Sequence, residues 1–159
     1  MALRAVDRAK IVHLLHDATS KKGVSFFAVV ARVTVDGKTQ NIPLNFKVTA
    51  DGTAVCESEA VVQSLETDVP EHNAECGFSA DKVLSKVASC TSDGAANASK
   101  TSKLVGEAKD RAVVGILAMF DPASPEVRSV VTEYHVLHCA NHGLNLLAGA
   151  SHKHEEECH

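Results

Sequence analysis

The chain has little aromatic character: among its 159 residues there is no Trp, and there are only five Phe and one Tyr. Proteins that bind single-stranded nucleic acid stack bases on aromatic rings, and this sequence offers few such platforms. The composition therefore disfavours a single-strand binding module. No apolar run approaches the roughly 18 residues that a membrane helix needs, and the start MALRAVDRAK lacks the apolar stretch of a signal peptide. We expect an intracellular protein without a membrane partner.

Disulfide pairing and excess positive charge are also missing. The five Cys are an odd number, widely spaced and without a C-x-x-C pair, so we expect reduced thiols rather than a disulfide framework. The 16 Lys and Arg are outnumbered by 20 Asp and Glu, and the net charge of −4 does not draw the whole molecule onto nucleic acid. Any contact with nucleic acid must therefore use a local patch.

What is present suits one globular domain. The chain is 45% hydrophobic and 23% charged, and folding at this length buries roughly 68–70% of the surface of the unfolded chain. We expect a single core domain over residues 1–150, followed by a polar tail rich in His and Glu over residues 151–159.

Hydrophobic periodicity predicts the order of the elements. Apart from its histidines, the run Ile11–Asp17 is apolar at both odd and even positions and predicts a strand buried on both faces. A helix that starts near Ala2 and continues through this run is the competing interpretation. Two alternating runs, 24–35 and 38–49, flank Asp36-Gly37 and predict a hairpin. Pro43 places the second run at a sheet edge, and the side chains expected to share one face of that run are Ile42, Leu44, Phe46 and Val48.

The second half alternates between helices and strands. The pattern predicts a helix that starts near Ala54 and ends before Pro70, and a short helix over 80–86. A strand over 87–93, a small-residue helix after a turn at Gly94 and a separate apolar stretch over 112–120 follow. A strand over 134–139 then feeds the helix ANHGLNLLAGA. Three strands in a meander followed by alternating helices and strands predict a mixed-sheet α/β domain with helices on both faces.

Two acids are expected at the carboxyl ends of strands, where α/β sheets place their sites. Asp17 ends the first predicted strand and Asp93 ends the fourth. Two neighbouring carboxylates repel unless a cation neutralises them, and Mg²⁺ prefers carboxylate and phosphate oxygens. The sharper interpretation is a metal site for phosphodiester chemistry. The plainer one is that both Asp residues are local caps and turn formers.

The segment HCANHGLNLL contains a C-x-x-H pair, Cys139 and His142, followed by Asn145. With tail residues these side chains would supply nitrogen and sulfur ligands for Zn²⁺, although no second tight pair is present and Zn²⁺ is disfavoured. A plainer interpretation makes Cys139 a small buried residue and Asn145 a buried polar group. The further side chains considered for zinc are His138, His152, His154, Cys158 and His159.

Cationic side chains near the two acids in the sequence are candidates for phosphate contacts, although exposed lysines more often solvate a surface. They are Lys21, Lys22, Lys100, Lys103 and Arg111.

The segments HDATSKK, TSDGAANASK and HCANHGLNLL, in this order, resemble the catalytic domain of hAT-like transposases and the host proteins derived from them. This resemblance implies an RNase H-like fold and a nuclear location of the protein. Its first metal-binding acid would be Asp17 and its second Asp93, and Mg²⁺ or Mn²⁺ would be the cofactor. The resemblance makes Cys139, His142 and Asn145 a structural or DNA-site motif, and DNA the partner.

The chain departs from that family in two respects. The large helical insertion and the third acid that follow the fifth strand in the family are missing, and Glu155, Glu156 and Glu157 lie too close to that strand to replace the acid. We therefore expect a truncated or domesticated core, at most a fragment of a metal-dependent nuclease or transposase. A non-catalytic DNA-associated or protein-interaction module is the main alternative, a zinc-stabilised domain is a lesser one, and a homo-oligomer is compatible with either.

Overall fold

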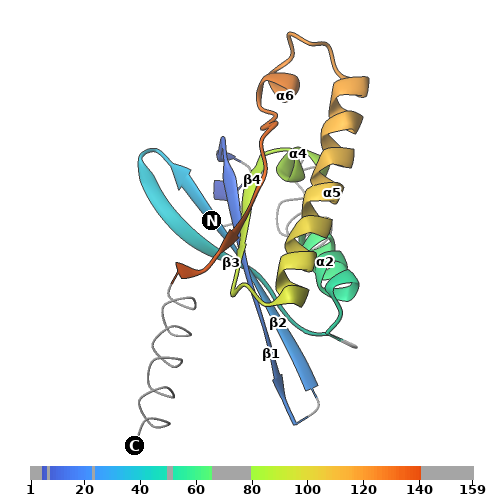
Figure 1. Cartoon of the computed structure of the whole chain (residues 1–159). Coiled ribbons are helices and arrows are strands. Elements are labelled where there is room, and N and C mark those ends of the chain that lie inside the picture. Colours follow the sequence, from blue (N-terminus) through green and yellow to red (C-terminus); the bar gives the residue numbers. More distant parts are fainter. Residues whose placement is uncertain (1–4, 7, 23, 50–51, 66–79, 141–159) are drawn as a thin grey trace, which may run out of the picture.

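A computed structural model describes residues 5–6, 8–22, 24–49, 52–65 and 80–140. It contains one five-stranded sheet in the order β3-β2-β1-β4-β5 (Figure 1). Strand β1 is antiparallel to β2 and β2 to β3, whereas β1 and β4 are parallel, as are β4 and β5. The strands are β1 (Val12–Lys21), β2 (Val24–Val35), β3 (Lys38–Thr49), β4 (Val87–Ser92) and β5 (His135–His138). The predicted mixed-sheet α/β class is therefore confirmed.

The predicted hairpin is present, with Asp36 and Gly37 both at positive φ (51° and 74°) between β2 and β3. This is the backbone that a two-residue turn between twisted strands requires. Strand β3, which contains Pro43, lies at the sheet edge as expected. Strand β1 is longer than predicted, because it continues past Asp17 to Lys21 and turns at Lys22 (φ 51°). The expectation that Asp17 ends the first strand was therefore wrong.

A β-bulge changes the facing of the second half of β3. Val30 pairs with Pro43 and Val29 with Asn45, so one residue of β3 is left over between the two pairs. An extra residue shifts the side-chain alternation by one. Ile42 and Leu44 are buried as predicted, but Phe46 and Val48 lie on the opposite face and are 71% and 64% exposed.

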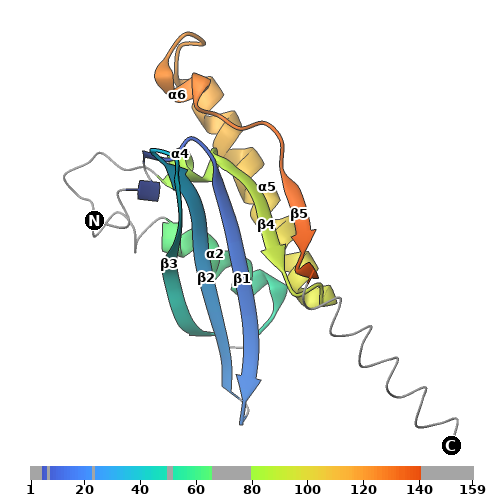
Figure 2. The same cartoon turned by 90° about the vertical axis from the view of Figure 1, so that its left-hand side faces the viewer.

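The helices are α2 (Ala54–Gln63), α4 (Ala80–Leu84), α5 (Ala96–Met119) and the short α6 (Pro125–Arg128). Helix α5 is one continuous helix of 24 residues, not a short helix followed by a separate apolar stretch. In Figure 2 the sheet faces the viewer and α2 and α5 lie behind it. The core lies between these layers, and its strand residues include Val12, Leu14, Phe27, Val29, Ala31, Val33, Ile42, Leu44, Val87 and Cys90.

The other face of the sheet is not covered by α2, α4 or α5 (Figures 1 and 2). The helix that the sequence predicts over ANHGLNLLAGA, which was expected to place helices on both faces, falls outside the described residues. We call the face opposite to α2 and α5 the open face. Within the described parts of the chain, no helix is long and apolar enough to cross a membrane.

Candidate functional site

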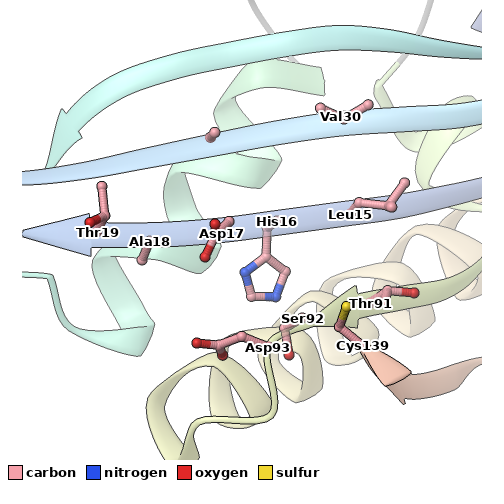
Figure 3. A pocket seen from close by; sticks show the side chains of 11 residues that line it. Leu15, His16, Asp17, Ala18, Thr19, Val30, Thr91, Ser92, Asp93 and Cys139 are labelled. Carbon is pink, nitrogen blue, oxygen red and sulfur yellow. The ribbon is translucent and has the colours of Figure 1, made fainter. Parts of the chain in front are cut away.

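A pocket of about 490 Å³ lies where strand β4 ends and β1 continues beyond it (Figure 3). Three strands contribute to its walls, and the segment after β5 closes one side. The lining residues are Leu15, His16, Asp17, Ala18, Thr19, Ala28, Val30, Thr91, Ser92, Asp93 and Cys139. Both acids predicted from the sequence therefore line a single pocket.

The pairing of β1 with β4 accounts for this meeting of the two acids. The strands run parallel and pair Leu15 with Thr91. Asp17 and Asp93 each lie two residues farther along their own segment, so they reach the same level at the carboxyl end of the sheet. Alternation along β1 places Asp17 on the open face, opposite to the buried His16. About half of the chain separates these two acids in the sequence, and only the pairing of β1 with β4 brings them together.

Asp93 also has the local role that the plainer interpretation gave it. Its Oδ1 accepts a hydrogen bond from the backbone N–H of Ala95 at 3.0 Å, just before α5 begins. The intervening Gly94 has φ of 87°, a conformation that favours glycine. This turn holds the Asp93 carboxyl in place at the pocket. A capping role and a role in the pocket are thus compatible for the same side chain.

The pocket is acidic. Its lining residues include two carboxylates and no Lys or Arg. Two carboxylates that share a site are best satisfied by a shared cation. In the described residues, however, no group of three or more His, Cys, Asp or Glu side chains is gathered to hold a metal ion. The chain itself thus offers two carboxylates, and any further ligands would be water or substrate oxygens.

His16 lies between β1 and the end of β4, next to the two acids (Figure 3). The side chain is only 5% exposed, and its Nε2 shares a hydrogen bond of 2.9 Å with Ser102 Oγ on α5. Burial lowers the pKa of His16 to about 4, although the negative charges of Asp93 and Asp17 act in the opposite direction. The imidazole is therefore neutral near pH 7 and does not compensate the charge of the carboxylates.

Two buried polar atoms beside the acids lack a hydrogen-bond partner in the described structure. They are Nδ1 of His16 and Oγ of Ser92, whose residues follow the Leu15–Thr91 pair directly in β1 and β4. Sequence reasoning missed both residues. The signal that was available is a polar residue in each of two otherwise buried strands, immediately before the predicted acid.

Cys139 is exposed, and its backbone N–H donates a 2.7 Å hydrogen bond to the carbonyl of Ser92. This bond holds the end of β5 against the end of β4 and brings Cys139 to the pocket. His142 and Asn145, predicted to act with Cys139, lie outside the described residues, as do the other zinc candidates of the tail and Glu155, Glu156 and Glu157. The zinc alternative therefore stays a prediction.

Four of the five predicted cationic residues do not line the pocket. Lys22, Lys100 and Lys103 are exposed elsewhere, and the side chain of Lys21 is outside the described set. Arg111 lies in a separate groove between α2 and α5. Phosphate contacts by these side chains thus stay a prediction too.

No protein-family model matches the chain, and no curated protein or solved structure matches it either. The resemblance to hAT-like transposases therefore depends on the three sequence segments alone.

Proposed function

We propose that this domain is derived from an RNase H-like transposase core and binds a divalent cation between Asp17 and Asp93 to act on a phosphodiester of DNA. The observation that carries the proposal is the meeting of these two acids in one pocket, where β4 ends beside the parallel strand β1. The resemblance of the surrounding segments assigned these same two residues as metal-binding acids.

The strand arrangement supports the RNase H-like part of the proposal. A three-stranded antiparallel meander is extended by two parallel strands, so that β1, with the first acid, lies in the centre of the sheet. The described elements that connect β1 to β4 are β2, β3, α2 and α4. The second acid thereby reaches the neighbour of the first strand, which is the placement the resemblance implies.

The donor set fits Mg²⁺ or Mn²⁺ better than Zn²⁺. Mg²⁺ is commonly held by one or two carboxylates, with waters and substrate phosphates as the remaining ligands. Asp17 is exposed and Asp93 is half-buried, so both leave room for such ligands. Binding by two carboxylates predicts weak affinity for the metal alone and stronger affinity when a phosphate contributes oxygens.

The protein's contribution to the chemistry would be positioning and charge. The Asp93 carboxyl is held by its bond to Ala95, whereas the central strand fixes the backbone of Asp17 and the face of the sheet from which its exposed side chain extends. If Asp17 and Asp93 hold a divalent cation, it would supply Lewis-acid stabilisation of a phosphodiester. With a third acid missing from the described site, we expect slow turnover.

Strand cleavage tests the proposal. Wild-type protein in Mg²⁺ or Mn²⁺ should nick DNA slowly, and Asp93→Asn should lower the rate by at least tenfold, because one of two metal-binding carboxylates is lost. Chelation should abolish cleavage. Equal rates in wild type and Asp93→Asn, with both proteins folded, would reject catalysis by this pocket.

The second candidate is a DNA-associated or protein-interaction module that has kept the fold without the chemistry. The absence of a third acidic ligand from the described residues around the pocket favours it. Duplex binding at low salt, where phosphate contacts are strongest, without cleavage in either metal would support this candidate. If the protein does not bind duplex DNA, a module that interacts with other proteins is the version of this candidate that remains.

A further inference from the structure

Two of the five Phe residues form an exposed aromatic surface next to the candidate site. Phe26 on β2 and Phe46 on β3 stack with ring centroids 5.9 Å apart and an interplanar angle of 17°. Phe46 is 71% exposed, and its neighbour Val48 is also exposed. A ring with its surface in water costs free energy unless a partner covers it.

The register places this surface on the same face of the sheet as Asp17. Asp17 pairs with Ala28 on β2, and Ala28 pairs with Phe46 on β3, so these three side chains form one cross-strand row. Residues directly opposite each other in antiparallel strands point to the same face. Phe46 is thus two strand spacings, roughly 10 Å, from Asp17, and the small Ala28 side chain leaves the space between them open.

We propose that Phe46, supported by Phe26, stacks against a nucleobase of a single-stranded segment whose phosphodiester lies at Asp17 and Asp93. This inference depends on the proposed function, because it takes the substrate to be nucleic acid. The low aromatic content disfavours a module that stacks many successive bases, but a single flat ring exposed on the open face is enough to stack one unpaired base. The bulge in β3 is what places Phe46 there.

The nucleobase is a better occupant of this surface than an apolar peptide. The surface is continuous with the acidic pocket through Ala28, which lines that pocket. A ligand that covers both the aromatic surface and the acidic pocket must carry a flat apolar group. About 10 Å away it must carry an anionic group that can bind a cation held by the two carboxylates. A nucleotide has both groups on one unit.

The contribution of stacking to affinity can be measured directly from the binding of a short fluorescent single-stranded DNA. Fluorescence anisotropy is recorded at low salt, once in EDTA and once in Ca²⁺. The wild type should prefer the strand with bases to the same strand with abasic sites. Phe46→Leu, which keeps apolar area but removes the ring, should weaken binding of the strand with bases about fivefold or more. Phe46→Trp should retain or strengthen that binding.

Phe120→Leu is the matched control, because Phe120 is also exposed (42%) but lies just after the end of α5. It should leave affinity unchanged. Equal affinity of wild type and Phe46→Leu for the strand with bases would overturn the inference while leaving the proposed function intact. A shift from dimer to monomer in Phe46→Leu would show that a second copy covers the ring, which also overturns it.

Asp93→Asn separates the two proposals. If the base stacks on Phe46, adding Phe46→Leu to Asp93→Asn should weaken binding of the strand with bases in EDTA. This loss of affinity should occur whether or not Asp93→Asn has abolished metal-dependent cleavage. Stacking without metal-dependent cleavage in the wild type would reject the proposed chemistry alone. Absence of binding to both strands under all conditions would overturn both proposals.

Discussion

His16 is the residue whose surroundings differ most from what its sequence position indicates. In the run IVHLLHD it is one polar residue within a buried strand. In the structure it touches α5 through Ser102, packs its ring 5.5 Å from that of Phe27, and lies beside two acids. Burial outweighs the attraction of the acids for a proton, so the neutral form of the imidazole is preferred.

This preference predicts a stability that depends on pH. The pKa of His16 is about 4 in the folded chain and near 6.5 when exposed, so the unfolded state binds a proton first as the pH falls. The free energy of unfolding should therefore decrease as the pH falls from about 6.5 to about 4, by up to about 3 kcal/mol. Urea unfolding in EDTA across this range measures it.

His16→Gln is the variant for comparison, since Gln does not titrate and can still reach Ser102. Its free energy of unfolding should depend less on pH over the same interval. His13→Gln, on the exposed side of the same strand, serves as the control and should behave as the wild type. A His16→Gln variant with an unaltered pH profile would contradict the argument.

At the scale of elements, helix α5 shows how one residue type acts in two ways. Gly106 and Gly115 both lie within the helix, where glycine costs about 1 kcal/mol relative to alanine. An added Cβ at Gly106 would meet the Tyr134 ring at 2.7 Å, whereas at Gly115 it would meet nothing within 4 Å. The Tyr134 hydroxyl donates to the carbonyl of Ser102 at 2.6 Å, so the ring is held against the helix.

The two alanine variants should therefore differ in sign. Gly115→Ala should raise the free energy of unfolding by about 0.5–1 kcal/mol, because only helix propensity changes. Gly106→Ala should lower it by about 1–3 kcal/mol, because Tyr134 must move in a packed contact. Thermal unfolding of both variants provides the measurement. Stabilisation by Gly106→Ala would mean that Tyr134 does not pack on this helix.

At the scale of the whole molecule, the sheet should determine the order of local opening. Strand β1 is hydrogen-bonded on both sides, to β2 and β4, and its core residues Val12 and Leu14 are fully buried. Strands β3 and β5 are the edges. Backbone amides in the most buried elements open only with the largest free-energy change.

Hydrogen exchange followed by mass spectrometry should therefore show the slowest exchange in peptides from β1. Peptides from β5 should exchange fastest among the strands, because it is short, at the edge and largely exposed. Faster exchange in β1 than in β3 would indicate that the central pairing does not form as described.

The sequence by itself determined the elements whose causes are local. Alternation over 24–35 and 38–49 with Asp36-Gly37 between them is sufficient to specify a hairpin, and Pro43 to assign it to an edge, since turn geometry and a missing donor act over a few residues. The two acids were also identifiable, through the segments that surround them.

Only the tertiary structure decided which side chains meet. Asp17 lies beside Asp93 because β1 and β4, which are far apart in the chain, pair in parallel with a particular register. Hydrophobic periodicity carries no information about that register. The exposure of Phe46 depends on one extra residue in β3, which reverses the facing of everything after it. The low pKa of His16 likewise comes from burial against α5, a contact between residues 86 positions apart.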